Sequence, residues 1–109
     1  MSQTILPNDT TSSNRRLPLT DGEIAQLMSA LEGWSLEGKA ITKTYEFPDY
    51  FETMAFVNAT AWISHRSDHH PDLTVGYSRC KVSYSTHDAG GLTRNDFTCA
   101  AKLDALFSQ

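Results

Sequence analysis

The histidines of this chain are unevenly placed, because all four fall between residues 65 and 87: His65, His69, His70 and His87. Two of them adjoin in the stretch Ser-Asp-His-His-Pro-Asp-Leu at residues 67–73. Imidazoles bind metals, transfer protons or sit near the negative end of a helix dipole. An imidazole in water titrates near pH ~6.5, so a cluster without metal suits acid and base roles at neutral pH.

The spacing of the adjacent pair bears on the choice between metal binding and proton transfer. Zinc ligands on a helix favour positions i and i+4, and those on a strand favour i and i+2, because such residues share a face. His69 and His70 are neighbours and point in different directions. The spacing therefore favours proton chemistry, and a metal site made of His69, His70 and His87 is the alternative.

The elements around the histidines predict that three of them converge. His69 and His70 follow a predicted helix and precede a predicted hairpin, and His87 comes just after the second strand of that hairpin. Because a hairpin returns the chain to its start, His87 is expected beside the pair. His65 lies in the last turn of the helix, where interaction with the helix dipole explains a histidine well.

Asp96 is a further candidate, because it begins a stripe of inward positions on the last predicted helix. Ala100, Leu103 and Phe107 continue that stripe at i+4, i+7 and i+11. A carboxylate buried without a partner is costly. Asp96 either closes a capping box onto Thr93 or holds a functional group, and both explanations stay open.

The loop before that helix, residues 86–91, carries further polar candidates. Thr86 and Asp88 are either plain turn residues or part of the site. Gly90-Gly91 supplies backbone freedom, and it would also let a ligand approach the main chain closely.

The elements that position these residues alternate along the chain. A capping box at Thr20 and Glu23 begins a helix that Gly33 is expected to end. Residues 34–47 alternate as a hairpin, Pro48-Asp49 opens a second helix that lasts to about Arg66, and residues 73–84 form a second hairpin. A last helix follows Thr93. The prediction is an α+β fold, helix-hairpin-helix-hairpin-helix, whose four-stranded antiparallel sheet is covered on one face by three helices.

The second predicted helix carries more apolar side chains than one face can hold. Two neighbouring stripes are Phe51, Ala55, Asn58 and Trp62, and Tyr50, Met54, Val57 and Ala61. One part is expected on the sheet and the other on a partner subunit, with this helix or the sheet edge at the contact. The prediction is a homodimer or homotetramer, in which Phe56 and Ile63 would be the residues to test.

Composition narrows the function classes. The 109 residues have a formal net charge of −4, and the nine Lys and Arg are spread out, which argues against nucleic-acid binding. No apolar run approaches the ~20 residues that span a bilayer, and no secretory signal begins the chain. Two cysteines without CxxC spacing fit a reduced, cytoplasmic setting. Residues 1–16 are expected to form a flexible arm, and residues 17–109 a single domain.

Taken together, these residues resemble the pterin-4a-carbinolamine dehydratase family. The resemblance covers roughly residues 17 to 107 and rests on a set of short motifs: His69-His70-Pro71, Tyr77, Thr86-His87, Gly91-Leu92-Thr93 and Asp96, with Gly33-Trp34 and Phe47. It implies a hydro-lyase that dehydrates 4a-hydroxytetrahydropterin to quinonoid dihydropterin and water, in recycling the cofactor of aromatic amino acid hydroxylases. It implies no metal and no cofactor, since the pterin is the substrate, and it also implies dimers or tetramers.

The resemblance also implies roles for individual residues. His69 and His87 would be the proton-transfer pair, and His70 would mainly bind and orient the pterin. The substrate-binding residues would be Asp68, Pro71, Thr86, Asp88 and Asp96, and Asp96 would hold an imidazole or bind the amino edge of the pterin. Two positions depart from the family pattern, where His65 replaces a glutamate and Asn95 replaces an arginine.

A non-catalytic role is the main rival prediction. Relatives of this family act as dimerisation partners of a transcription factor or as assembly factors for carbon-fixation enzymes. The assembly factors tend to lose the catalytic histidines. His69, His70 and His87 are all present here, which favours an enzyme.

Overall fold

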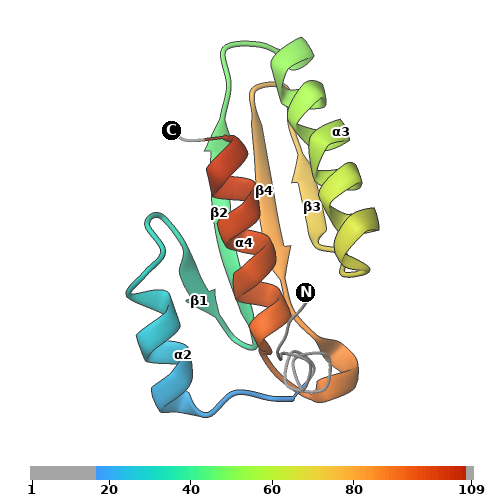
Figure 1. Ribbon diagram of the computed structural model, residues 1–109. Helices are drawn as coiled ribbons and strands as arrows, with labels where there is room; N and C mark the ends of the chain where they lie inside the picture. Colours follow the sequence, from blue (N-terminus) through green and yellow to red (C-terminus); the bar gives the residue numbers. More distant parts are fainter. Residues whose placement is uncertain (1–16, 108–109) are drawn as a thin grey trace.

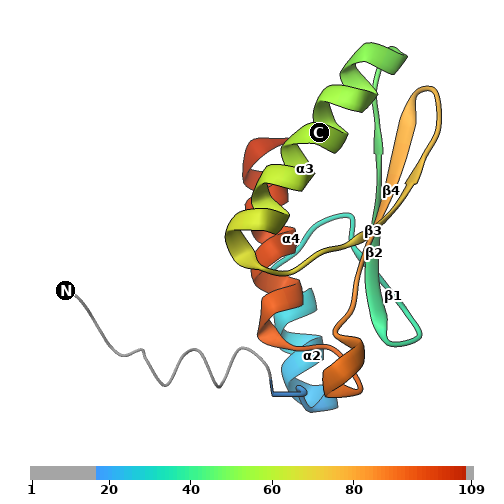
Figure 2. The ribbon, with the colours of Figure 1, turned by 90° about the vertical axis from the view of Figure 1, so that its right-hand side faces the viewer.

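The fold consists of one antiparallel sheet with helices on one face, seen in a computed structural model that describes residues 17–107 (Figures 1 and 2). The helices are α2 (Asp21–Met28), α3 (Tyr50–Ser67) and α4 (Arg94–Leu106), with a short 3-10 turn η1 (His87–Ala89). The strands are β1 (Ser35–Glu37), β2 (Ala40–Glu46), β3 (Asp72–Val75) and β4 (Arg79–Tyr84), in the sheet order β1-β2-β4-β3. The predicted α+β fold is confirmed. The arm predicted at residues 1–16 lies outside the described residues.

The core lies between the sheet and helices α3 and α4. Alternation along β2 and β4 directs every second residue inward, as the hairpin patterns predicted. The buried residues of the sheet are Ile41, Tyr45, Cys80, Val82 and Tyr84, and those of α4 include Phe97, Cys99, Ala100 and Leu103. Both cysteines are buried free thiols. No helix between residues 17 and 107 is long and apolar enough to cross a membrane.

The first helix is shorter than the sequence predicts. The capping box is present, because Glu23 N–H donates to Thr20 Oγ1 at 3.2 Å and Thr20 N–H donates to Glu23 Oε1 at 2.9 Å. The helix ends at Met28, and two i to i−3 backbone bonds carry the chain through residues 30 and 31. Gly33, expected to end the helix, instead turns the chain into β1 with a φ of 83°.

Helix α3 presents a different face to the core from the one predicted. Its buried residues are Thr53, Phe56, Thr60, Ile63 and Ser64. The two predicted stripes lie outside this face, and Phe51 and Trp62 are 81% and 61% exposed. The polar residues are accommodated because their hydroxyls donate to backbone carbonyls, as Ser64 does to Thr60 at 2.7 Å. Phe56 and Ile63 are therefore core residues and cannot test a subunit contact.

A carboxylate on α4 ties the first hairpin to the helical layer. Asp104 accepts hydrogen bonds from Trp34 Nε1 at 2.9 Å, from Lys43 Nζ at 2.8 Å and from the hydroxyl of Tyr45. Burial raises the pKa of Asp104, but the hydrogen bonds from Lys43, Tyr45 and Trp34 and the charge of Lys43 outweigh burial and place that pKa below its ordinary value.

We expect Asp104→Asn to lower the free energy of unfolding at pH 7 by about 1–3 kcal/mol, because three donors lose a charged acceptor. Since the folded-state pKa lies below the ordinary value of 3.8, the contribution is fully present above pH 3.8 and disappears as the pH falls through the lower value. Urea unfolding of both proteins at pH 7 and at about pH 3, roughly one unit below the ordinary pKa, measures the difference in the free energy of unfolding. Equal stability of the two proteins at pH 7 would show that the network contributes nothing.

Candidate active site

The junction between α3 and β3 places the histidine pair. Helix α3 ends at Ser67, and Asp68 follows in the left-handed conformation with a φ of 49°. The N–H of Asp68 bonds back to His65 O, and the N–H of His69 donates to Ser64 O at 3.2 Å. This conformation costs a non-glycine residue about 1–2 kcal/mol. The sharp reversal sends the chain directly from the helix toward the sheet, with His69 as the first residue after the turn.

His69 is held between a carboxylate and an aromatic ring. Its Nε2 lies 2.6 Å from Asp96 Oδ1, and its side chain is 11% exposed. The imidazole stacks on the ring of Tyr84, with centroids 5.9 Å apart and an angle of 12° between the planes. A carboxylate only accepts hydrogen bonds, so Nε2 carries the proton of this bond. In a neutral imidazole Nδ1 is then the nitrogen without a proton, which accepts a hydrogen bond.

Asp96 combines the two roles that the sequence left open. It is fully buried in the first turn of α4. Its Oδ2 accepts from Thr93 N–H at 2.9 Å and from Thr86 Oγ1 at 2.8 Å, while Oδ1 faces His69. The carboxylate therefore caps the helix and holds the imidazole at once. Its burial is offset by these three partners.

Tyr84 is a site neighbour that the sequence analysis missed. Burial raises the pKa of its hydroxyl, and the nearby Cys99 and Asp96 raise it further, so the group stays protonated. Among the described residues that hydroxyl has no hydrogen-bond partner. The inward alternation of β4 was the available signal. It placed Tyr84 in the core without showing that His69 would stack on it.

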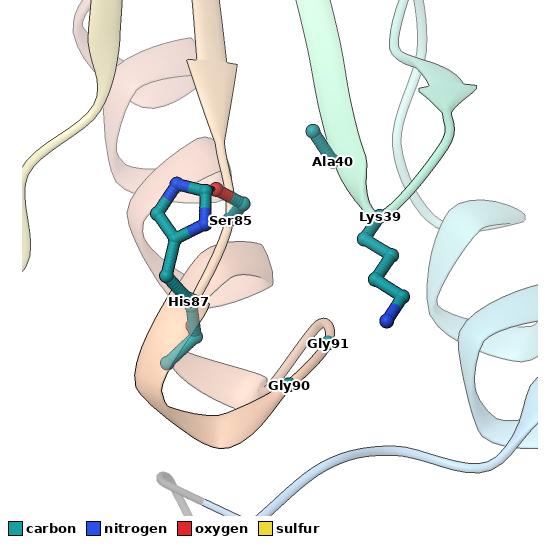
Figure 3. Close-up of a pocket in the computed structure, with 7 residues that line it drawn as sticks. Lys39, Ala40, Ser85, His87, Gly90 and Gly91 are labelled. Carbon is teal, nitrogen blue, oxygen red and sulfur yellow. Dashed lines mark hydrogen bonds between the residues drawn. The ribbon is translucent and has the colours of Figure 1, made fainter.

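His87 lies in the wall of an open cavity of about 270 Å³ (Figure 3). The cavity is lined by Lys39, Ala40, Ser85, Thr86, His87, Gly90 and Gly91. His87 belongs to η1, is exposed, and has its Nε2 3.3 Å from Ser85 Oγ. Lys39 lies in the turn before β2 and Ala40 is the first residue of β2, far from His87 in sequence, so the pairing of β2 with β4 brings them here.

The predicted site residues divide into two connected groups. His69 does not line the cavity that holds His87, but a chain of hydrogen bonds joins it to the cavity wall through Asp96 and Thr86. Thr86 is buried and donates to Asp96, so its hydroxyl positions that carboxylate. His70, Asp68 and Asp88 are exposed and Pro71 is half-buried, and none of these four lines the cavity.

Metal ligation by the histidines was the alternative to proton transfer. Within residues 17–107, no three side chains of His, Cys, Asp or Glu gather in a group that could hold a metal ion. The Nε2 atom of His69 faces the carboxylate of Asp96.

Comparison with known proteins shows which family this chain resembles over most of its length. The family model for pterin 4 alpha carbinolamine dehydratase matches residues 17–106. A relative from Nitrosospira multiformis, provisionally named pterin-4-alpha-carbinolamine dehydratase, is 62% identical over 90 residues, which are 83% of this chain and 80% of the relative. A relative of the same provisional name from Chromobacterium violaceum is 56% identical over 97 residues, covering 89% of this chain and 90% of its own.

Two solved structures are also similar. A transcriptional coactivator/pterin dehydratase from Brucella melitensis superposes with a TM-score of 0.77 at 33% identity, covering 82% of this chain and 97% of its own. A pterin dehydratase-like protein identified as a RuBisCO assembly factor in the alpha-carboxysome gives a TM-score of 0.61 at 26% identity, covering 72% and 93%. The family model spans all three helices and the whole sheet. The chain therefore belongs to the pterin-4a-carbinolamine dehydratase family.

Proposed function

We propose that this protein dehydrates a 4a-hydroxytetrahydropterin to the quinonoid dihydropterin, with histidines as the acid and base. The hydrogen bond between His69 and a fully buried Asp96 carries the proposal, because it orients an imidazole that would otherwise rotate freely. The physiological source of the substrate is an aromatic amino acid hydroxylase, which forms the carbinolamine.

The reaction needs two proton transfers. The oxygen on carbon 4a takes a proton, the bond between carbon 4a and oxygen breaks, and water leaves. The proton on N5 is removed, and its bonding electrons form the double bond between N5 and carbon 4a. One group that donates a proton and one that accepts a proton are sufficient, and each is worth about 10²–10⁴-fold in rate.

The residues divide this work as follows. His69 and His87 exchange the two protons, with Nδ1 of His69 available because its Nε2 is bound to Asp96. Thr86 and Thr93 fix Asp96, and Tyr84 supports the flat face of His69. Asp68, His70 and Pro71 precede β3 and Asp88 follows β4, so the pairing of Asp72 with Ser83 puts them at the same end of the sheet, where we place them as contacts to the bound pterin.

The direct test is a dehydration assay. A hydroxylase generates the carbinolamine in solution, and the rate of its loss is compared with and without this protein. A rate above the uncatalysed reaction, proportional to protein concentration, supports the proposal. A rate equal to the uncatalysed reaction at every protein concentration would contradict it and favour the non-catalytic rival, a binding or assembly protein like the similar carboxysome factor.

We expect the activity to survive removal of divalent metals, since proton transfer alone accounts for the reaction. Dialysis against a chelator, followed by metal analysis and assay, is the measurement. Loss of activity that zinc or iron restores would establish the metal-dependent alternative instead.

A second part of the proposal is self-association. Helix α3 and the strand next to it expose a band of large apolar side chains, with Tyr50 and Tyr77 stacked at 6.2 Å between centroids. The band consists of Tyr50, Phe51, Trp62, Val75 and Tyr77, which are 51%, 81%, 61%, 42% and 68% exposed. It continues to β3, the edge strand of the sheet. A second copy of the chain would cover such a surface.

We expect the double variant Phe51→Glu, Trp62→Glu to dissociate a homodimer or homotetramer into monomers, because both side chains are exposed and lie outside the core. Light scattering at micromolar concentration gives the mass. Leu106→Glu is the matched control, since Leu106 is 58% exposed on α4, away from this band. A wild-type monomer at that concentration would refute the self-association.

A further inference from the structure

The two histidines proposed to exchange protons are held in different ways. The imidazole of His69 has a fully buried carboxylate, Asp96, at 2.6 Å and is stacked on the ring of Tyr84. His87 is exposed, and within residues 17–107 the only hydrogen bond of its ring joins Nε2 to Ser85 Oγ, at 3.3 Å. The orientation of His87 therefore depends on a single hydroxyl.

The neighbours Ser85 and Thr86 each serve one of the two histidines. Thr86 is buried and donates to Asp96 Oδ2 at 2.8 Å, and Asp96 in turn holds His69. Ser85 is half-buried, lines the same cavity as His87, and lies against the ring of His87 in Figure 3. Both residues directly follow β4, where successive side chains point to opposite faces. The alternation of the strand thus continues past its end and sends one hydroxyl to each histidine.

A hydroxyl is a suitable partner for an imidazole that changes its protonation state. It has one O–H donor and two lone pairs, and it rotates to suit its partner. When Nε2 of His87 has no proton, Ser85 Oγ donates to it, and when Nε2 carries a proton, the same oxygen accepts. The contact therefore persists in the neutral ring and in the protonated ring. A carboxylate only accepts, so the partner of His69 has no such freedom.

We infer that Ser85 is a positioning residue for His87, whose hydroxyl holds the imidazole at the cavity wall before and after proton transfer. This inference rests on the proposed function, because Ser85 acts on the reaction only through His87. Without the hydroxyl the exposed ring rotates freely, so the productive orientation is less populated. The turnover then falls, while the affinity for the substrate changes little.

The first measurement is the dehydration assay. Ser85→Ala is expected to lower turnover about three- to tenfold, the size expected for the loss of one hydrogen bond between neutral groups, with KM nearly unchanged. Ser85→Thr keeps a hydroxyl and should retain most of the turnover. Ser83→Ala is the matched control, because Ser83 lies on β4 two residues earlier and does not line the cavity. It should turn over at the wild-type rate.

A double-mutant cycle shows whether Ser85 acts through His87. In a protein that already carries His87→Ala, the further change Ser85→Ala is expected to have no effect on turnover, because the ring that it positions is gone. A loss as large as that in the wild-type background would mean that Ser85 acts on the substrate itself. That result would overturn the inference.

Nuclear magnetic resonance of ¹⁵N-labelled histidine rings tests the contact without turnover. Ser85→Ala is expected to move the Nε2 signal of His87 and to leave the signals of His65 and His70 in place. Ser85→Thr should keep the wild-type position of the His87 signal. An unchanged Nε2 signal in Ser85→Ala would show that the hydroxyl does not hold the ring in solution, and the inference would be wrong even for an active enzyme.

The outcomes separate the positioning role from the proposed function. If the wild-type protein does not accelerate dehydration, the proposed function fails, and the positioning role fails with it. If the wild-type protein is active and Ser85→Ala turns over at the same rate, the proposed function stands and the positioning role is wrong.

Discussion

His69→Ala and His87→Ala are each expected to lower the turnover of carbinolamine dehydration by about 10²–10⁴-fold, with the fold preserved. The expected loss is large because the reaction needs a proton donor and a proton acceptor, and these imidazoles supply the two groups. His87 is exposed, and the side chain of His69 is 11% exposed and is not part of the buried apolar core, so neither change removes a core side chain.

The measurement is the dehydration assay on both variants, with circular dichroism to confirm the fold. His65→Ala is the matched control, because His65 is exposed on α3 before the turn at Asp68. It should retain wild-type turnover. If both single variants turned over at the wild-type rate, acid–base catalysis by this pair would be excluded.

Asp96→Ala is expected to reduce both stability and turnover. The change leaves three buried or half-buried donors without their acceptor, on Thr93, Thr86 and His69. An unsatisfied buried group costs about 1–3 kcal/mol, so the free energy of unfolding should fall by about 2–5 kcal/mol. Turnover should fall as well, because the ring of His69 loses the partner that fixes its orientation and the position of its proton.

Urea unfolding and the dehydration assay measure the two effects separately. Asp96→Asn is the informative companion, because it keeps the size of the side chain but replaces one accepting oxygen with a donating amide. It should retain more stability than Asp96→Ala and still lose turnover. Asp72→Asn, exposed on β3, controls for the loss of one negative charge. A stability change below about 1 kcal/mol in Asp96→Ala would show that the network does not hold the site together.

Local chemistry explains why much of the fold was predictable. Thr20, Asp49 and Thr93 cap their helices as predicted, since a capping side chain and the N–H groups it accepts from lie within four residues of each other. The alternation along β2 and β4 was also predicted correctly, because successive side chains of a strand point to opposite faces of the sheet. The pairing of Asp72 with Ser83 confirms the second hairpin.

The inward face of α3 was not predictable from residue type. Thr53, Thr60 and Ser64 are polar, so the two apolar stripes that include Phe51 and Tyr50 were expected to supply the contact with the sheet and the contact with a partner subunit instead. In the structure these hydroxyls donate to backbone carbonyls, which removes most of the cost of burying them. The apolar residues left outside are the ones we assign to self-association.

Some residues of the candidate site were predictable from the sequence and others were not. The cost of burying Asp96 without a partner correctly predicted that it would have one, and the structure identifies His69, Thr86 and Thr93. Lys39 escaped notice because it is far from the histidines in sequence, and Tyr84, three residues before His87, because its inward position on β4 was explained by the core alone. Only the pairing of β2 with β4, and the stacking of His69 over β4, bring them to the site.

The proposed mechanism requires that the buried pair of His69 and Asp96 and the exposed His87 act on one ligand, although His69 does not line the cavity that holds His87. Nuclear magnetic resonance of protein with ¹⁵N-labelled histidines, titrated with a 7,8-dihydropterin, tests this most directly, and the four histidines serve as one another's controls. We expect the ring signals of His69 and His87 to shift together with a single dissociation constant, while the signal of His65 stays in place. Saturation of the ligand with the signal of His69 or of His87 unmoved would contradict it.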